Sequence, residues 1–400
     1  MLENQLGPVR YIPAFDGVRA LCITLVITFH VISSDRPWLD NVAKRGWCGV
    51  DVFFVLSGFL ITWIVADEMD KSGTVNLPRF YARRALRLQP AYLSGLFGFA
   101  LLLLLFDRER FYIIARELPF FLTYTINLAV ALGFVAFPPY GHAWSLCIEE
   151  QFYLCWSWTL RRFGTRRCLR IALGVVSFVV VYRTALYAWL NWHHLAAASP
   201  RSLDRIYFGT DTRIDTILVG CAAALAMREP ALQNVMKRIR DWPWLTAFAA
   251  VGLLVIFAWA TGGASKGGWR SWRSATIGFT LMALATALVV IALHLQPESM
   301  LSRSLSWSPM VSVGKVSYGV YLFHWPVWSA LARLTQLHAA GALKQEVAAF
   351  LIVWFASVTL AWIHFRVVET RFLWLRSKLE DRLKREPRPG GSHRATGIRI

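Results

Sequence analysis

The sequence predicts an all-α membrane protein, a bundle of about ten transmembrane helices. Hydrophobic residues make up 56% of the 400 residues and charged residues only 17%, and the mean hydropathy is +0.44. Apolar runs of about 20 residues, the length that crosses a bilayer as a helix, recur from one end of the chain to the other. The 19 tryptophans often stand near the ends of these runs, which is typical of the aromatic belts at a membrane interface.

Ten segments qualify as membrane spans by length and apolar content. An eleventh candidate, 118–137, holds three polar residues near its centre (Thr123, Thr125 and Asn127) and ends at a pair of prolines. We interpret it as a re-entrant or interfacial segment, because counting it as a span would reverse the orientation of everything after it. The ten predicted spans are 16–35, 48–67, 88–106, 143–161, 170–190, 213–227, 243–261, 275–294, 310–333 and 345–367.

The distribution of Lys and Arg predicts the orientation. With ten spans and the N-terminus inside, the inside loops and the tail hold more basic residues than the outside loops, as the positive-inside rule requires. Both termini are therefore expected in the cytoplasm. Residues 1–370 form the predicted membrane domain, and the basic, Pro- and Gly-containing segment 371–400 is expected to be a disordered cytoplasmic tail.

The net charge of +19 does not indicate a nucleic-acid partner, because most basic residues lie in short loops between apolar runs. The six cysteines show neither a CxxC pair nor the Cys/His spacing of a metal site. We expect them to be small buried residues, and we predict no metal and no permanently bound cofactor.

The first span carries two costly polar groups, Arg19 and His30. Eleven residues separate them, which is almost three whole helical turns and about 16 Å of rise, so both side chains are expected on one face. Ionisable groups at membrane depth usually face the bundle interior or a water-filled cavity. A simpler interpretation remains open for each residue: Arg19 as an interfacial anchor paired with Asp16, and His30 as a buried structural histidine.

The fourth span offers a partner for His30. Its start, "HAWSLCIEEQFYL", places Glu149 and Glu150 about two turns in from the outer side. Spans one and four run antiparallel, so we expect His30 and one of these glutamates at comparable depth. A histidine–carboxylate pair suits general-base chemistry, because the carboxylate fixes the tautomer and stabilises the imidazolium. A structural ion pair and a proton relay remain as alternatives.

Further polar residues gather in the outer half of the bundle. Each one alone fits hydrogen bonding between helices, which is the favoured interpretation for Ser57 and Ser317. Their accumulation on one side of the midplane favours a binding or oxyanion site. The candidates for acceptor binding or oxyanion stabilisation are Asp51, Ser57, Arg213, Asp215, Tyr318 and His324.

The inner side carries an arginine cluster in "RFYARRALRLQP". Arg84 and Arg87 share a helical face at i,i+3, and Arg83 precedes Arg87 by four residues. Guanidinium groups match the geometry of phosphate, so the three arginines are candidates to bind the phosphates of a cytosolic donor. A plain topology signal is the alternative, and no P-loop or dinucleotide-binding motif is present.

Six motifs, in this order, resemble the acyltransferase family 3 proteins, and together they cover residues 11 to about 370. The resemblance implies a ten-span enzyme of the bacterial inner membrane. Such enzymes transfer an acyl group, usually acetyl, from cytosolic acyl-CoA to a hydroxyl of a carbohydrate or glycolipid, such as surface polysaccharide, lipopolysaccharide or peptidoglycan. The motifs are "YIPAFDGVRA…FH", "GVDVFFVLSGFLIT", "FYARRALRLQPAY", "HAWSLCIEEQFYL", "TRIDTILVG" and "VGKVSYGVYLFHWPV".

The resemblance also implies roles for particular residues. Arg19 and His30 match the essential pair of the family, Arg84 and Arg87 match its Arg-x-x-Arg element, and Glu149 matches its motif glutamate. One position departs from the pattern: Cys147 stands where many members have serine.

The mechanism expected from these residues has His30, oriented by Glu149, remove the proton from an acceptor hydroxyl, whose oxygen then attacks the thioester. Tyr318, His324 or Arg19 would stabilise the oxyanion. Direct transfer and an acyl-histidine relay both remain open. The alternative from another class is a proton-coupled transporter of a sugar-like or small organic solute, although no internal repeat is visible. A third is a non-catalytic partner in glycan assembly.

Overall fold

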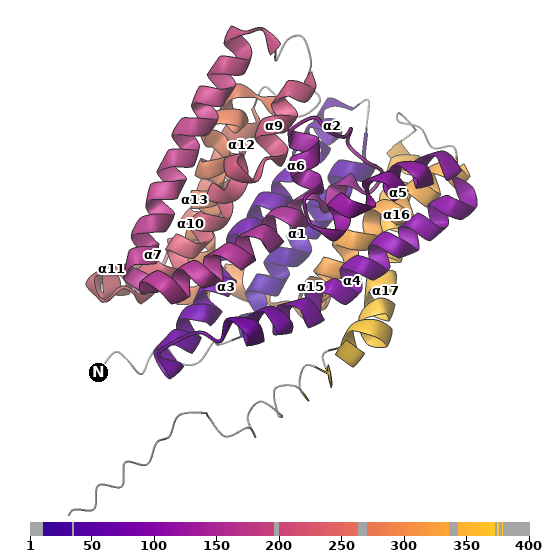
Figure 1. Ribbon diagram of the computed structural model, residues 1–400. Coiled ribbons are helices and arrows are strands. Elements are labelled where there is room, and N and C mark those ends of the chain that lie inside the picture. The colour runs from indigo at the N-terminus through magenta and orange to yellow at the C-terminus, as the bar shows by residue number, and fades with distance from the viewer. Residues whose placement is uncertain are drawn as a thin grey trace, which may run out of the picture.

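The computed structural model describes residues 11–33, 36–195, 200–262, 270–335 and 343–372, together with Trp374, Leu375 and Lys378. Within these residues every regular element is a helix and there is no strand, so the predicted all-α fold is confirmed (Figure 1). Most of the predicted tail, 371–400, lies outside the described residues.

Long helices make up the body of the bundle, and short helices and turns join them. The long helices are α1 (Pro13–Val31), α3 (Gly49–Ser72), α4 (Leu77–Phe106), α7 (Trp144–Trp192), α10 (Thr210–Arg228), α12 (Leu245–Thr261), α13 (Phe279–Leu295), α16 (Ser317–Thr335) and α17 (Leu343–His364). The short helices are α2 (Pro37–Ala43), α5 (Arg108–Leu122), α6 (Ile126–Ala131), α9 (Asp204–Phe208), α11 (Gln233–Arg240), α14 (Met300–Leu305) and α15 (Ser308–Lys315). Single 3-10 turns are η1 (Gly46–Cys48), η2 (Gly141–Ala143), η3 (Pro200–Leu203) and η4 (Pro230–Leu232), and η6 (Ser274–Gly278) and η7 (Phe365–Glu369) are π-helical.

The predicted spans overlap helices of the described chain, but 310–333 divides between α15 and α16 at Val316, and residues 34–35 of the first span lie outside the described residues. By length and apolar content, six helices are able to cross a membrane, or seven if a pair bent by 95° is counted as one span. Two predicted spans, 143–161 and 170–190, join in α7, which breaks at Gly164 with a φ of 74°. The left-handed backbone at this position suits glycine, which has no Cβ to clash. The protein is thus a helical membrane bundle, and the count of ten and the cytoplasmic termini stay predictions.

The segment 118–137 is not one continuous helix. It begins within α5, breaks around Tyr124, whose φ is 55°, and continues in the six-residue helix α6. The Gln151 side chain holds the break, because its Nε2 donates to the Tyr124 carbonyl at 2.6 Å and to Asn127 Oδ1 at 3.0 Å. A broken, side-chain-bonded backbone is what a re-entrant or interfacial segment requires.

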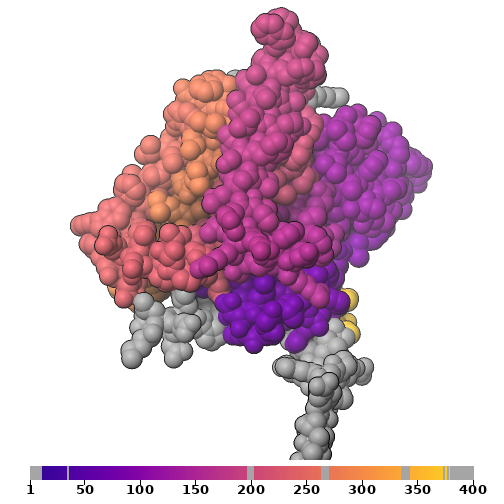
Figure 2. Space-filling view, turned by 60° about the vertical axis from the view of Figure 1, so that its left-hand side comes forward, coloured from indigo at the N-terminus to yellow at the C-terminus, as the bar shows by residue number. Residues whose placement is uncertain are grey.

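The bundle is organised around α1. In Figure 1, α7, α10, α12 and α13 lie to one side of α1, and α4, α5, α16 and α17 lie to the other. The short helices α2, α6 and α9 gather at the end where α1 finishes. Figure 2 shows α7 (magenta) standing between the α12–α13 side (orange) and the α4–α5 side (purple).

Helix α10 packs directly on the backbone of α3 through two glycines. A Cβ on Gly58 would lie 2.0 Å from the Ile217 carbonyl oxygen, and a Cβ on Gly220 would lie 2.1 Å from that of Val55. Small residues at such crossings let helix backbones approach closely, which is how membrane helices gain packing energy.

We predict that Gly220→Ala destabilises the protein in detergent by about 1–3 kcal/mol or more, because the added methyl group forces two helix backbones apart. The matched control is Gly252→Ala in α12, where a Cβ would meet nothing within 4 Å. Thermal unfolding of both purified variants is the measurement. Equal melting temperatures for the two variants would contradict the close crossing.

Candidate functional site

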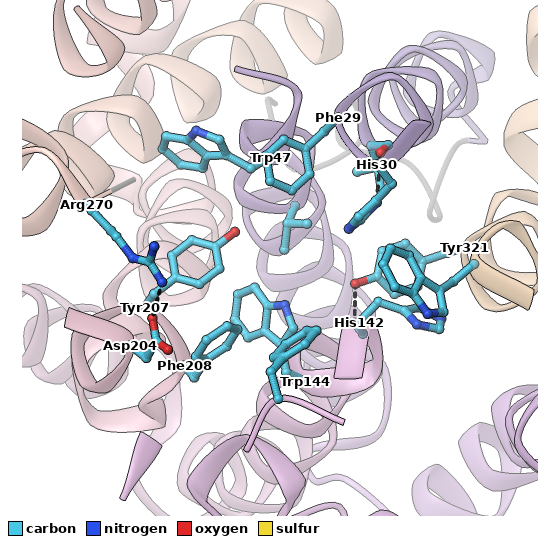
Figure 3. A pocket seen from close by; sticks show the side chains of 14 residues that line it. Phe29, His30, Trp47, His142, Trp144, Asp204, Tyr207, Phe208, Arg270 and Tyr321 are labelled. Carbon is cyan, nitrogen blue, oxygen red and sulfur yellow. Dashed lines mark hydrogen bonds and ion pairs between the residues drawn. The ribbon is translucent and has the colours of Figure 1, made fainter. Parts of the chain in front are cut away.

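A cavity of about 270 Å³ opens beside the end of α1, and its walls are mostly aromatic (Figure 3). Its lining comes from α1, η1, η2, the start of α7, α9 and α16. Flat aromatic walls with a few polar groups are typical of sites for small organic ligands. The aromatic walls include Trp47, Trp144, Tyr207, Phe208 and Trp325.

His30 lies in the last turn of α1 and lines this cavity. Its Nδ1 is 2.9 Å from the Val26 carbonyl oxygen and 3.2 Å from His324 Nε2. Because a carbonyl only accepts hydrogen bonds, Nδ1 of the neutral ring carries the proton, and Nε2 keeps its lone pair. No described residue bonds His30 Nε2, and Figure 3 shows a ring nitrogen of His30 directed into the cavity.

His324, a predicted acceptor or oxyanion candidate, is the immediate partner of His30. It is fully buried in α16, and its Nδ1 is 2.7 Å from the Tyr321 carbonyl oxygen. By the same argument Nδ1 carries the proton, so His324 Nε2 offers a lone pair to the His30 Nδ1–H. The structure therefore brings these two histidines together and assigns one tautomer to each.

Glu149 does not orient His30, so the predicted pairing of these two residues is wrong. The Glu149 carboxylate accepts hydrogen bonds from Ser57 at 3.1 Å and Tyr153 at 2.8 Å. The physical reason is depth. His30 is one residue from the end of α1, whereas Glu149 is already more than a turn inside α7, nearer the middle of the bundle. Ser57, a predicted acceptor candidate, is thereby occupied with Glu149.

Arg19 lies near the start of α1, at the other end from His30. Its guanidinium forms an ion pair with Asp16 at 2.8 Å, and the Tyr11 hydroxyl donates to the same carboxylate at 2.7 Å. The anchoring alternative for Arg19 is thus what the structure shows, and Arg19 does not line the cavity as an oxyanion donor would.

The three arginines of the predicted donor site have different surroundings. Arg83 pairs with Glu68 of α3 at 2.8 Å. Arg84 stacks its guanidinium 3.3 Å from the centre of the Tyr153 ring, a close cation–π contact. Arg87 is exposed. Arg84 and Arg87 thus stay candidates to meet a donor, because Arg84 lies on a ring that leaves its charge in place and Arg87 is exposed.

Asp51, Arg213 and Asp215 do not line the cavity, which corrects their prediction as acceptor or oxyanion groups. Arg213 donates to Asp51 at 2.5 Å, and Asp215 pairs with Arg183 at 3.0 Å; all four side chains are buried. Sequence reasoning did not single out Arg183, although an arginine in the middle of an apolar run was the available signal. Two positive and two negative charges balance in this group, which we call the buried charge network.

Tyr318, another predicted oxyanion candidate, is also engaged elsewhere. Its hydroxyl donates to the Leu88 carbonyl of α4 at 3.3 Å, and Tyr318 is not among the residues that line the cavity. Its contact joins α16 to α4, so we assign it a packing role in place of the predicted catalytic one.

His142 is a cavity residue that the sequence reasoning missed. It lies in η2, is 3% exposed, and its ring is 5.2 Å from that of His324. Both of its ring nitrogens are buried without a hydrogen bond to any described residue. The signal was available, because His142 opens the motif "HAWSLCIEEQFYL". Within the described chain, no three His, Cys, Asp or Glu side chains form a metal-binding group.

Comparisons with known proteins identify a family. The family described as "Acyltransferase domain" matches residues 12–366. The protein YrhL of Bacillus subtilis is 33% identical over 329 residues, which are 80% of this chain and 49% of that protein. No solved structure matches the chain.

YrhL is named as a peptidoglycan O-acetyltransferase, and two further relatives carry similar names. A protein named O-acetyltransferase OatA, from Staphylococcus aureus, is 29% identical over 380 residues, 92% of this chain and 58% of its own length. One named peptidoglycan O-acetyltransferase OatA, from Listeria monocytogenes, is 30% identical over 380 residues, 90% of this chain and 56% of its own length. The chain thus spans about half the length of these curated relatives.

We predict that Asp215→Ala destabilises the protein by about 3–5 kcal/mol, because it leaves Arg183 buried and without its counter-charge. The control is Asp241→Ala, which removes a surface pair with Arg240 and costs at most about 1 kcal/mol. Melting temperatures in detergent are the measurement. An Asp215→Ala protein that melts normally yet has lost its activity would place the network in the reaction site instead.

Proposed function

The chain belongs to the acyltransferase domain family, and from this premise we propose that it is a membrane O-acyltransferase. The proposed reaction transfers an acyl group, acetyl by analogy with the names of the relatives, from cytosolic acyl-CoA to a hydroxyl of a cell-envelope carbohydrate. The names of the relatives favour a peptidoglycan-like glycan as acceptor. Because the donor is cytosolic and the acceptor lies outside, we propose the bacterial inner membrane as the location.

One observation carries this proposal: a histidine nitrogen with a free lone pair faces an aromatic cavity. The bonds to Val26 and His324 put the proton of His30 on Nδ1, so Nε2 is ready to act as a general base. The aromatic walls suit a sugar ring, whose apolar face packs on indole and phenol rings while its hydroxyls remain available. The cavity volume of about 270 Å³ favours one ring of an acceptor entering at a time.

The proposed chemical step uses this geometry directly. His30 Nε2 takes the proton of the acceptor hydroxyl as the oxygen attacks the thioester carbonyl carbon. The tetrahedral intermediate then expels CoA as a thiolate, which recovers the proton from the imidazolium of His30. His324 Nε2 accepts from the His30 Nδ1–H, so it stabilises the positive charge that His30 carries between the two steps.

The donor is proposed to enter from the opposite end of the bundle. Arg87 is exposed there and Arg84 lies one turn away on the same helix, so both are placed to meet the phosphates of CoA. Polar side chains continue inward from Arg84, through Tyr153 and Glu149 to Ser57. The arm of the donor that carries the acyl group then has to reach from the arginines to His30. This distance is comparable with the rise of about 16 Å along α1 from Arg19 to His30.

We predict that His30→Ala lowers acyl transfer by about 10²- to 10⁴-fold, the usual contribution of a general base. The protein is expected to remain folded, because His30 is only partly buried at the end of a helix. Release of CoA from acetyl-CoA by the purified protein, with a glycan acceptor, is the measurement. The control is His193→Ala, a histidine that is exposed at the end of α7.

Two results would contradict this function. A His30→Ala protein with wild-type turnover would remove the proposed base. Proton-coupled solute uptake into vesicles without consumption of acetyl-CoA by the wild type would favour the transporter alternative.

We predict that Arg87→Ala raises the KM for acyl-CoA about ten-fold or more while kcat changes little, because a phosphate contact is lost far from the reacting atoms. The effect should shrink at high salt, since Arg87 is exposed to screening ions. The control is Arg108→Ala, which removes an exposed charge just beyond the other end of α4. An unchanged KM for Arg87→Ala across salt concentrations would exclude Arg87 from the donor site.

A further inference from the structure

We propose that His142 is a second catalytic residue, the hydrogen-bond donor to the oxyanion that forms when the acceptor attacks the thioester. This inference rests on the proposed function and adds to it the group that stabilises the transition state. An acyl transfer needs such a donor, because negative charge develops on the carbonyl oxygen as the tetrahedral intermediate forms.

The donors expected from the sequence either lie away from the cavity or use their protons on other groups. Arg19 is paired with Asp16 at the far end of α1. The Tyr318 hydroxyl donates to the Leu88 carbonyl. His324 uses its only proton on the Tyr321 carbonyl and presents a lone pair to His30. None of these three residues offers a free N–H or O–H to a ligand in the cavity.

His142 does offer one. In the neutral ring one nitrogen carries a proton and the other a lone pair, and neither bonds a described residue. The Leu322 carbonyl lies beside the ring without meeting hydrogen-bond geometry. An unpartnered buried donor is costly and therefore uncommon in a folded protein. His142 lines the cavity, but both nitrogens are buried, so neighbouring side chains have to shift slightly before a ligand can supply the partner.

The surroundings hold the His142 ring in place without using its nitrogens. Its own carbonyl accepts from the Tyr321 hydroxyl at 2.6 Å, and the rings of Tyr140 and His324 lie 4.5 Å and 5.2 Å away in edge-to-face contact. Trp325 contacts both His30 and His142. The ring is thus fixed by its backbone and by aromatic packing, which is the preorganisation that oxyanion stabilisation requires.

His142 also has the right position relative to the proposed base. His324 contacts both histidines, with ring centres 5.1 Å from His30 and 5.2 Å from His142. Figure 3 shows His30, His142 and Tyr321 together on one side of the cavity, opposite Arg270 and Asp204. A hydroxyl held at His30 Nε2 and a thioester carbonyl directed toward His142 would therefore meet at the same wall.

Trp47 carries the other buried ring donor of the cavity wall that lacks a bond to a described residue. Its indole nitrogen is directed away from the cavity centre in Figure 3. Geometry therefore favours His142 over Trp47 as the donor to a bound acyl group.

The test compares His142→Phe, which keeps a flat ring but removes both nitrogens, with His142→Gln, which keeps an N–H donor. We expect His142→Phe to lower kcat about 10²- to 10³-fold, the usual loss for one oxyanion donor, with little change in KM for acetyl-CoA or acceptor. His142→Gln should recover part of this loss. The control is His294→Phe in α13, away from the cavity. His294 is partly buried, and its Nδ1 also lacks a bond to a described residue. This variant should keep wild-type kcat.

A second readout does not depend on the reaction. If His142 serves a ligand, replacing an unpartnered polar ring by an apolar one should leave the melting temperature unchanged or raise it. A lowered melting temperature with a matching loss of activity would make His142 a structural residue and overturn the proposal. A rise in acceptor KM at constant kcat would overturn it too, because it would assign the ring to acceptor binding. Absence of acetyl-CoA turnover by the wild type would instead disprove the proposed function itself.

Discussion

Four buried charges hold the walls of the cavity in place. Arg183 joins α7 to α10 through Asp215, and Arg213 joins α10 to α3 through Asp51. Charged groups inside a bilayer have no water to solvate them, so each must find its partner within the bundle. The Arg213 guanidinium also lies 5.2 Å from the centre of the Tyr207 ring, which lines the cavity. The buried charge network thus fixes both a helix crossing and one wall of the site.

The sequence was sufficient for the helices and for the position of His30, because both follow from local pattern. Apolar runs give helices, and a histidine near the end of the first run must lie near one face of the bundle. It was not sufficient for the partner of His30. Which residues of two antiparallel helices lie at the same depth can be predicted only if the start of each helix is known. Helix α7 begins at Trp144, close to His142 and about a turn and a half before Glu149. His30 and His142 therefore lie near the same end, and Glu149 lies deeper.

Burial and pairing distinguish polar residues with a structural role from candidate catalytic residues. Neither burial nor pairing can be read from the sequence. Asp51 and His324 looked alike as outer-half polar residues, but the first meets an arginine and the second meets the proposed base. If Arg183 had been counted with Arg213, the two arginines would have equalled the two aspartates of this group in number. That balance would have indicated ion pairs. The arginine cluster shows the same limit, since the sequence does not reveal that Arg83 pairs with Glu68 of α3.

The proposed donor site at Arg84 and Arg87 and the cavity at His30 place different demands on their residues. At the proposed donor site, binding a charged donor would need cations near water, where their charge costs little. At the end with His30, group transfer needs neutral imidazoles whose protons are assigned in advance, and the carbonyls of Val26 and Tyr321 make that assignment. A carboxylate beside His30 would have held a proton there and raised the basicity of the ring. The partner actually present, a second neutral histidine, brings no charge to the cavity, which suits the uncharged hydroxyl and the neutral thioester of the proposed reaction.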